Sequence, residues 1–266
     1  MKSFKNNIQS NFNEWKEQGK CSQAIALNKK IGSEYFCESN PHFFTGDLNA
    51  DLVLVHLNPK RNKNNTTKKF DVEKPKFNSF EEYFDYFRYF GRHNYGKNSE
   101  RNHKSPFDKK QIRFLKPLNI LPFTGTDTYK DLEIVIDNKL QIELIPFGSE
   151  NFNFNEVGVK NIEPFLDTIL SLIAAKERKY VIFCGRVFDN ILNEYISKKR
   201  VHEFKLQKTD GTFTKGDYHF IEVELKYNDK IIKAIIAPQY AMQGMPIEQY
   251  GIKLNELLNG KKINKN

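Results

Sequence analysis

Large apolar side chains recur at helical spacing near the amino terminus. Four of them follow one another at intervals of four, four and three residues: Phe4, Ile8, Phe12 and Trp15. This spacing predicts an amphipathic helix over residues 3–18, which we expect to pack on the rest of the protein as an amino-terminal arm. Residues 22–31 predict a second short helix, with Ala24, Ile25 and Leu27 facing inward. Residues 38–51 are dense in Asn, Pro, Gly and Asp and predict a loop.

The clearest strand signal is the segment DLVLVHLNPK, residues 51–60. The apolar run from Leu52 to Val55 is rich in β-branched residues and predicts a strand buried on both faces. Pro59 cannot donate a ladder hydrogen bond and pushes Asn58 out of the helical region, so Asn58 should lie at the carboxyl end of this strand. In open α/β sheets, ligands bind at such ends. The segment is therefore either a core strand followed by a turn or part of a ligand site.

Basic segments follow this strand and flank an aromatic helix. Five of the ten residues from Lys60 to Lys69 are basic, so this segment is either a solvated loop or a loop that contacts phosphates beside the site. Ser79 and Glu82 form a capping box. The helix that follows carries seven aromatic side chains within residues 80–90, which either lie buried beneath flanking loops or line a cavity or a base-stacking groove. Residues 91–110 are either a plain surface loop or an insertion that faces nucleic acid.

The middle of the chain predicts a helix followed by two strands. Residues 111–123 predict a helix that is broken at Pro117. The apolar runs 132–136 and 140–147 predict strands joined by a tight turn. Glu143 is a carboxylate within the second run, so it either faces water on an edge strand or reaches a site.

In the last part of the chain, predicted helices and strands alternate as in an α/β protein. Its predicted elements are a helix, a strand, a helix, two strands and a helix, over residues 161–176, 180–185, 187–198, 217–225, 231–237 and 246–258. Strand, glycine and helix in succession are typical of a parallel sheet. We therefore expect an α/β fold with a central, mostly parallel sheet of four to six strands, helices on both faces and a hairpin at one edge.

The charge balance favours a polyanionic partner. The 266 residues include 42 Lys and Arg against 33 Asp and Glu, which gives a formal net charge of +9. A surplus of this size is typical of proteins that bind nucleic acid, although many basic proteins bind none.

The cysteines, the histidines and the lengths of the apolar runs argue against disulfide-rich, metal-binding and membrane proteins. The three cysteines are odd in number and have no C-x-x-C spacing, and His93 and His103 have no cysteine or acidic cluster nearby. These patterns predict neither a disulfide framework nor a metal site, and we expect no cofactor. The sequence shows no signal peptide and no apolar run long enough to span a membrane. We expect a cytoplasmic protein with no membrane partner, and we favour a monomer.

Four strand ends fall in an order that resembles a known superfamily. They are H-L-N-P-K at residues 56–60, E-L-I-P-F-G-S at 143–149, F-C-G-R at 183–186 and A-P-Q-Y-A-M-Q-G-M-P at 237–246. With the lead-in Gly46-Asp47, this succession resembles the uracil-DNA glycosylase superfamily. It is most similar to the prokaryotic glycosylase-like proteins that carry L-N-P-G and E-x-x-P-[YF]-x-S motifs, and the resemblance extends over residues 40–250.

The resemblance implies a three-layer α/β/α sandwich that flips a damaged base into a pocket at the carboxyl ends of the central strands. Asn58 is similar to the residue that orients or activates the attacking water, and Gln239 belongs to the second catalytic motif. The base would stack on Phe147 or on an aromatic residue of the 80–90 helix. The implied base-binding set is completed by three further residues: Glu143, Ser149 and Tyr240. The implied DNA contacts are four residues, of which the last would be an intercalating wedge: Lys60, Arg61, Lys63 and Met242.

The chain departs from the family pattern at four of these positions. Lys60 stands where the mismatch-type enzymes have glycine. Gln239 and Tyr240 stand in a motif that usually contains a histidine to stabilise the departing base. Glu143 lies near the place of the asparagine that reads the pyrimidine edge. Because an ionised carboxylate only accepts hydrogen bonds, it would repel the carbonyls of uracil but could accept from an exocyclic amine such as that of cytosine or adenine.

Three functions remain open. The leading hypothesis is a DNA repair glycosylase, a hydrolase that excises a flipped, modified or mispaired base by water attack on the N-glycosidic bond. The alternative is a non-catalytic nucleic-acid-binding protein of the same fold. A third is a nucleotide or nucleoside hydrolase, which would leave the basic segments unexplained. We expect a helical arm over residues 1–38, one glycosylase-like domain over 39–260 with basic insertions near 60–110, and a basic tail over 261–266.

Overall fold

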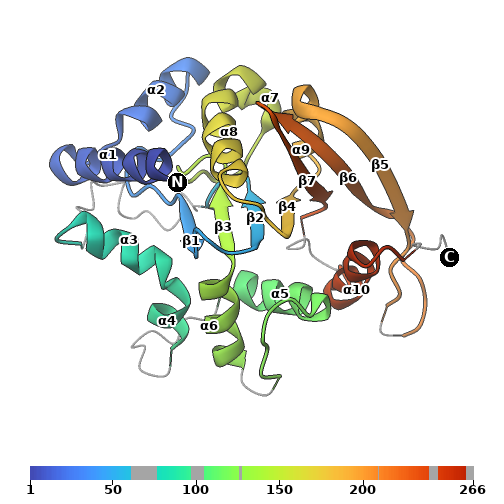
Figure 1. Ribbon diagram of the computed structural model, residues 1–266. Helices are drawn as coiled ribbons and strands as arrows, with labels where there is room; N and C mark the ends of the chain where they lie inside the picture. Colours follow the sequence, from blue (N-terminus) through green and yellow to red (C-terminus); the bar gives the residue numbers. More distant parts are fainter. Residues whose placement is uncertain (61–76, 97–104, 126–127, 209, 240–244, 262–266) are drawn as a thin grey trace.

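A single sheet lies at the centre of the protein. The computed structural model describes residues 1–60, 77–96, 105–125, 128–208, 210–239 and 245–261. The strands among them form one seven-stranded sheet in the order β1-β3-β2-β4-β7-β6-β5 (Figure 1). Their bounds are β1 Phe44–Gly46, β2 Leu52–His56, β3 Leu140–Glu143, β4 Tyr180–Cys184, β5 Ile196–Phe204, β6 Tyr218–Tyr227 and β7 Lys230–Ala237. The predicted α/β class is confirmed, and the sheet is larger than the predicted four to six strands.

The central strands are parallel and the outer ones are not. Strands β3, β2, β4 and β7 run parallel. Strand β1 is antiparallel to β3, and β6 and β5 extend the other side as an antiparallel meander with β5 at the edge. Because β3 and β4 lie on opposite sides of β2, the strand order reverses there. This reversal is the place where open α/β sheets bind ligands, outside the carboxyl ends of the strands.

Helices cover both faces of the sheet. The helical elements are α1 Lys2–Gln18, α2 Ser22–Ile31, α3 Phe80–Arg88, α4 Phe90–Tyr95, α5 Pro106–Leu115, η2 Lys116–Leu118, α6 Thr128–Asn138, α7 Phe154–Val157, α8 Val159–Ala174, α9 Phe188–Ile191, η3 Asn193–Tyr195 and α10 Ile247–Leu258. Val53 and Val55 pack in a buried cluster with α1, α3 and α8, whereas Leu52 and Leu54 pack with α5, α6 and α10. Alternate residues of β2 thus serve two cores, which explains its unbroken apolar run. None of the described helices is long and apolar enough to cross a membrane.

The two amino-terminal helices agree with the sequence pattern except at one residue. All four predicted apolar residues of α1 are buried. Helix α2 has the predicted bounds, but Ile25 is 42% exposed, so its predicted inward orientation is wrong. The buried face is formed by Ala24, Leu27 and Asn28, which are related by helical steps of three and four residues.

Two predicted elements have the wrong type. Residues 132–136 belong to helix α6 and are not a strand, because Leu132, Val135 and Ile136 are buried at helical spacing. A parallel connection from β2 to β3 also requires a crossover, which helices supply. The predicted helix 187–198 ends at Ile191, and β5 begins at Ile196. Most of β5 is exposed, so it lacks the apolar alternation that identifies a strand.

Two predicted loops contain regular structure. Strand β1 lies within the loop predicted over residues 38–51, and α4 and the start of α5 lie within the polar segment 91–110. The hydroxyl of Ser105 caps α5 by accepting from the backbone N–H of Asp108 at 3.3 Å, and Pro106 takes the first helical position.

Gly46 allows β1 to lie tightly against β3. Its φ is +92°, a conformation that side chains with a Cβ rarely adopt, and an added Cβ would fall on the carbonyl oxygens of Lys139 and Ile136. The neighbouring Asp47 forms an ion pair of 3.0 Å with Arg88 of α3. The Gly46-Asp47 lead-in therefore has a structural role in fixing this edge of the sheet.

We predict that Gly46→Ala lowers the free energy of unfolding by about 3 kcal/mol or more, because backbone strain adds to a clash that backbone atoms must move to relieve. Gly216→Ala is the matched control, since a Cβ there meets no atom within 4 Å, and it should change stability by less than about 0.5 kcal/mol. Urea unfolding of the two variants measures both values. Equal stabilities would contradict this account of Gly46.

Candidate functional site

Polar residues spaced two positions apart lie on one face of the sheet, at the carboxyl ends of its parallel strands. His56 ends β2, and Asn58 follows two residues later on the same face. The register between β2 and β3 sets His56 beside Glu143. Farther along the sheet, Ala237 ends β7, and Gln239 follows two residues later. Three strand ends thus direct polar residues towards one region.

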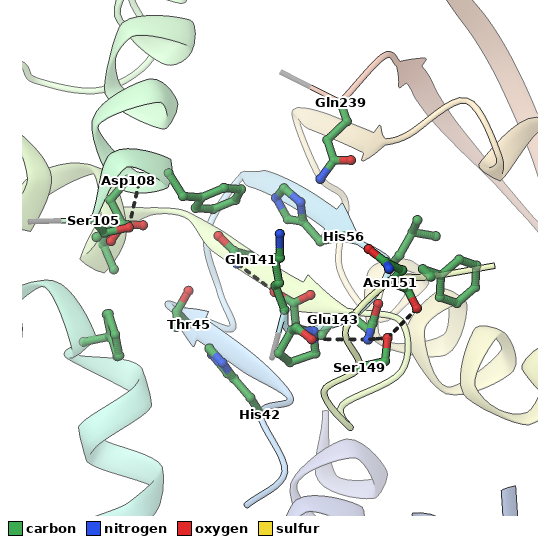
Figure 2. Close-up of a pocket in the computed structure, with 18 of the residues that line it drawn as sticks. His42, Thr45, His56, Ser105, Asp108, Gln141, Glu143, Ser149, Asn151 and Gln239 are labelled. Atoms are coloured by element: carbon green, nitrogen blue, oxygen red, sulfur yellow. Dashed lines mark hydrogen bonds between the residues drawn. The ribbon is translucent and has the colours of Figure 1, made fainter. Parts of the chain in front are cut away.

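These strand ends surround a cavity of about 770 Å³. Asn58, Glu143 and Gln239 all line it. Figure 2 shows His56 on β2, Gln141 and Glu143 on β3, and Gln239 entering from the end of β7 with its amide directed towards the imidazole of His56. The volume lies within the range of pockets that bind small molecules.

Asn58 is held in place by the loop that follows β3. Pairing continues beyond the strand ends, because the N–H of Leu144 donates to the carbonyl of His56 at 2.8 Å and that of Ser149 donates to the carbonyl of Pro59 at 3.1 Å. The Nδ2 of Asn58 then donates to Ser149 Oγ at 2.8 Å and to the carbonyl of Phe147 at 3.3 Å.

The hydroxyl oxygen of Ser149 and the side-chain carbonyl oxygen of Asn58 differ in their hydrogen bonds. Ser149 is buried, and its hydroxyl donates to the carbonyl of Asn151 at 2.9 Å, so it is available to Asn58 only as an acceptor. Among the described residues no hydrogen bond reaches the Oδ1 of Asn58. This oxygen is therefore the acceptor that Asn58 can offer to a water or a ligand.

One face of β3 carries a buried polar ladder. Lys139 Nζ donates to Gln141 Oε1 at 2.9 Å, and Gln141 Nε2 donates to Glu143 Oε1 at 2.8 Å. Gln111 of α5 adds a second donor to Gln141 Oε1 at 3.0 Å. Gln141 and Glu143 of β3, and Lys139 directly before it, all line the cavity. Oε1 of Glu143 is paired with Gln141, and no hydrogen bond from the described residues reaches Oε2, so Oε2 is the carboxylate oxygen that Glu143 can offer to a ligand.

Burial changes the ionisation of the groups around this ladder. It raises the pKa of Glu143 to about 7, against opposing effects of the Gln141 hydrogen bond and the Lys139 charge. It lowers the pKa of Lys139 to about 8. Burial, followed by the nearby charge of Lys139, lowers the pKa of His56 to about 3. His56 is thus a neutral imidazole at physiological pH, and Glu143 exchanges a proton near neutrality.

Helix α5 forms another wall of the cavity. Its cap residue Ser105 and its residues Phe107 and Asp108 line the cavity. The ring of Phe107 meets that of His56 edge-on at 5.5 Å between centroids. Asp108 accepts a hydrogen bond from the hydroxyl of Tyr95. The helix therefore positions an aromatic ring and a carboxylate opposite β2.

Five of the ten residues singled out from the sequence line this cavity: Asn58, Lys60, Glu143, Ser149 and Gln239. Glu143 is buried and lies on an inner strand, so the predicted placement on a solvated edge strand is wrong, and its side chain lines the cavity. Four others lie outside the described residues: Arg61, Lys63, Tyr240 and Met242.

The structure does not bring the ring of Phe147 to the cavity. Its side chain is fully buried in the core and meets Phe165 edge-on at 6.3 Å. Only its carbonyl contributes to the site, as an acceptor for Asn58. Phe90, Phe107 and Phe152 are the aromatic residues that line the cavity, and Phe90 belongs to the predicted 80–90 helix.

Sequence reasoning missed several cavity residues. Lys139 and Gln141 alternate with Leu140 and Ile142, a period of two that marks one polar strand face and could have been noticed beside Glu143. His56 is similarly two residues before Asn58. Asp108 lines the cavity from helix α5, and Gln111 of the same helix supports the ladder behind it, but no local pattern predicts the position of this helix.

The described residues contain no group of three or more His, Cys, Asp or Glu side chains that could hold a metal ion. Comparisons of the chain with protein-family models, with curated proteins and with solved structures give no match.

We predict that Glu143→Gln makes the protein progressively more stable relative to the unsubstituted protein as pH rises from 4.5 to 7. The pKa of Glu143 is higher in the folded state than its ordinary 4.5. Its stabilising contribution is therefore complete below pH 4.5 and is lost as pH rises to 7. Glutamine does not titrate, so the difference should grow by about 1 kcal/mol per pH unit. A difference that is constant across this range in urea unfolding would contradict the assignment.

Proposed function

We propose that this protein is a DNA glycosylase that hydrolyses the N-glycosidic bond of a flipped nucleotide. The observation that carries the proposal is that Asn58, Glu143 and Gln239 line one cavity although they come from three different strand ends. The parallel strands with helices on both faces are compatible with the three-layer sandwich of the uracil-DNA glycosylase superfamily. The cavity volume is sufficient for a nucleoside.

Asn58 is proposed to position the attacking water. Its amide nitrogen is fixed by Ser149 and Phe147, which directs its other end, Oδ1, to accept from water. The water oxygen bonds to the anomeric carbon of the sugar, the carbon–nitrogen bond breaks with both electrons going to the base, and a proton from that water neutralises the departed base. The products are the free base and an abasic sugar.

His56 is proposed to replace the histidine that the second motif lacks. It lines the cavity and is neutral because burial lowers its pKa to about 3. A neutral imidazole can donate an N–H hydrogen bond to negative charge that develops on the departing base. The chain would thus keep an imidazole donor at a different position, at the end of β2 instead of in the segment after β7.

Glu143 is proposed to contact the edge of the base. In its ionised form Oε2 accepts from an exocyclic amine, and in its protonated form it also donates to a carbonyl. Because burial brings its pKa to about 7, both forms are populated near neutral pH. The objection that a carboxylate repels uracil therefore applies only to the ionised form.

A non-catalytic nucleic-acid-binding protein of the same fold is the second candidate. The observation in its favour is that the hydrogen bonds of Asn58 Nδ2 join two loops and so have a purely structural use. Binding would then fall steeply with salt and be unchanged by loss of the Asn58 side chain.

We predict that Asn58→Ala slows base excision about 100- to 1,000-fold, the cost of losing one well-placed polar group. Ser149→Ala should slow it less, about tenfold, because Asn58 remains but loses its strongest anchor. Single-strand and duplex oligonucleotides with uracil, hypoxanthine, 5-substituted pyrimidines or mismatches are incubated with excess enzyme and then treated with alkali. Asn155→Ala, an exposed site on α7, is the control and should be as active as the unsubstituted protein. Unchanged excision in Asn58→Ala would rule out its role.

We predict that His56→Phe, which keeps a ring beside Phe107, slows excision about 100-fold, whereas His56→Gln retains an N–H donor and recovers part of the rate. Single-turnover rates on the best substrate measure this. Because the pKa of His56 is about 3, its substitution should leave the shape of the rate profile between pH 5 and 8 unchanged. Equal rates in the Phe and Gln variants would count against a donor role.

A further inference from the structure

A second cavity lies directly beside the first. Its volume is about 580 Å³, and it lies at the carboxyl ends of β4 and β7. Leu57, Phe152 and Gln239 line both cavities, so these side chains form the partition between them. A ligand that fills the first cavity can therefore extend into the second without crossing the body of the protein.

The lining of the second cavity suits a flat ring. Phe154 enters from α7 and Tyr218 from the start of β6, and both are partly buried, so part of each ring remains available. Gly185 and Gly216 line the cavity without side chains, and a Cβ on Gly216 would meet no atom within 4 Å. Aromatic side chains around an open space are the usual platform on which nucleic-acid bases stack.

An arginine stands beside these rings. Arg186 is exposed and lines the cavity, and its Nη2 lies 3.2 Å from the Nδ1 of His219. Burial and the charge of Arg186 lower the pKa of His219. A neutral His219 can accept from the guanidinium and so hold it in place. Arginine remains charged at all relevant pH values and is well suited to bind phosphate.

We propose that the second cavity takes the base of the nucleotide adjacent to the flipped one, with Arg186 on the phosphate between them. This inference rests on the proposed function. In a duplex the neighbouring base stays paired and stacked, so filling both cavities would require two nucleotides to leave the helix. A single strand does not carry that cost. The substrate class is therefore single-stranded or locally unpaired nucleic acid.

The test compares oligonucleotides long enough to form a stable duplex, which carry either a base or an abasic spacer next to the central nucleotide, on its 5′ or its 3′ side. Affinities come from fluorescence anisotropy, with single strands and the same sequences in duplex. Removing the base on one side should weaken binding of the unsubstituted protein about tenfold, the typical contribution of one stacked base. Single strands should bind more tightly than duplexes.

Substitutions in the second cavity should abolish this dependence on the neighbouring base. Phe154→Leu removes the aromatic face but keeps apolar packing, and Gly216→Leu fills open space. Ile231→Ala, at the opposite end of β7 and 54% exposed, is the control and should retain the full tenfold dependence. Arg186→Gln should weaken binding of all sequences and reduce the salt dependence by about one phosphate contact.

Three results would overturn the inference: no effect of the neighbouring base, the same effect in Phe154→Leu and Gly216→Leu as in the unsubstituted protein, or equal binding of duplex and single strand. Excision is assayed in parallel on the same oligonucleotides. Dependence on the neighbouring base with no excision of any target would support the second cavity and contradict the proposed reaction. Excision without dependence on the neighbouring base would support the proposed reaction and contradict the role of the second cavity.

Discussion

The pairing of β2 with β3 beyond their strand ends is the constraint on which the site depends. Backbone hydrogen bonds continue from His56 to Pro59 on one segment and from Leu144 to Ser149 on the other. They fix the register in which Asn58 meets Ser149 and in which His56 lies beside Glu143. A shift of one residue would turn each of these side chains to the opposite face of the sheet. The polar cavity therefore exists only in this register.

Burial is the second determinant, because it adjusts the protonation of the groups that this register brings together. The cavity lies above a core that excludes water, so His56 is neutral and Glu143 is protonated up to about pH 7. The two changes suit the proposed reaction, in which a neutral donor and a carboxyl group would face an uncharged base. Their cost to folding is reduced by the hydrogen bonds that run from Lys139 through Gln141 to Glu143.

The positions of the strand ends could be predicted from the sequence, whereas the side chains that surround them in the cavity could not. Asn58 and Gln239 each follow an apolar run and stand next to a proline, Pro59 and Pro238, and those signals are local. Residues 132–136 of helix α6 have the sequence pattern of a strand as well, because a short apolar run fits both the helical period of 3.6 residues and the strand period of two. The buried ring of Phe147 and the contribution of α5 depend on how distant elements pack. The polar face of β3 was visible as alternation but was obscured by the apolar residues between its members.

The central claim is that the residues at these strand ends hold a nucleobase and release it by hydrolysis. The most direct measurement is mass spectrometry of the free base after incubation of excess protein with single-stranded and duplex oligonucleotides that carry modified or mispaired bases. The account predicts one released base for each abasic site formed, with both formed about 100- to 1,000-fold more slowly in Asn58→Ala. The absence of a free base from every oligonucleotide, with the protein folded and bound to nucleic acid, would contradict it.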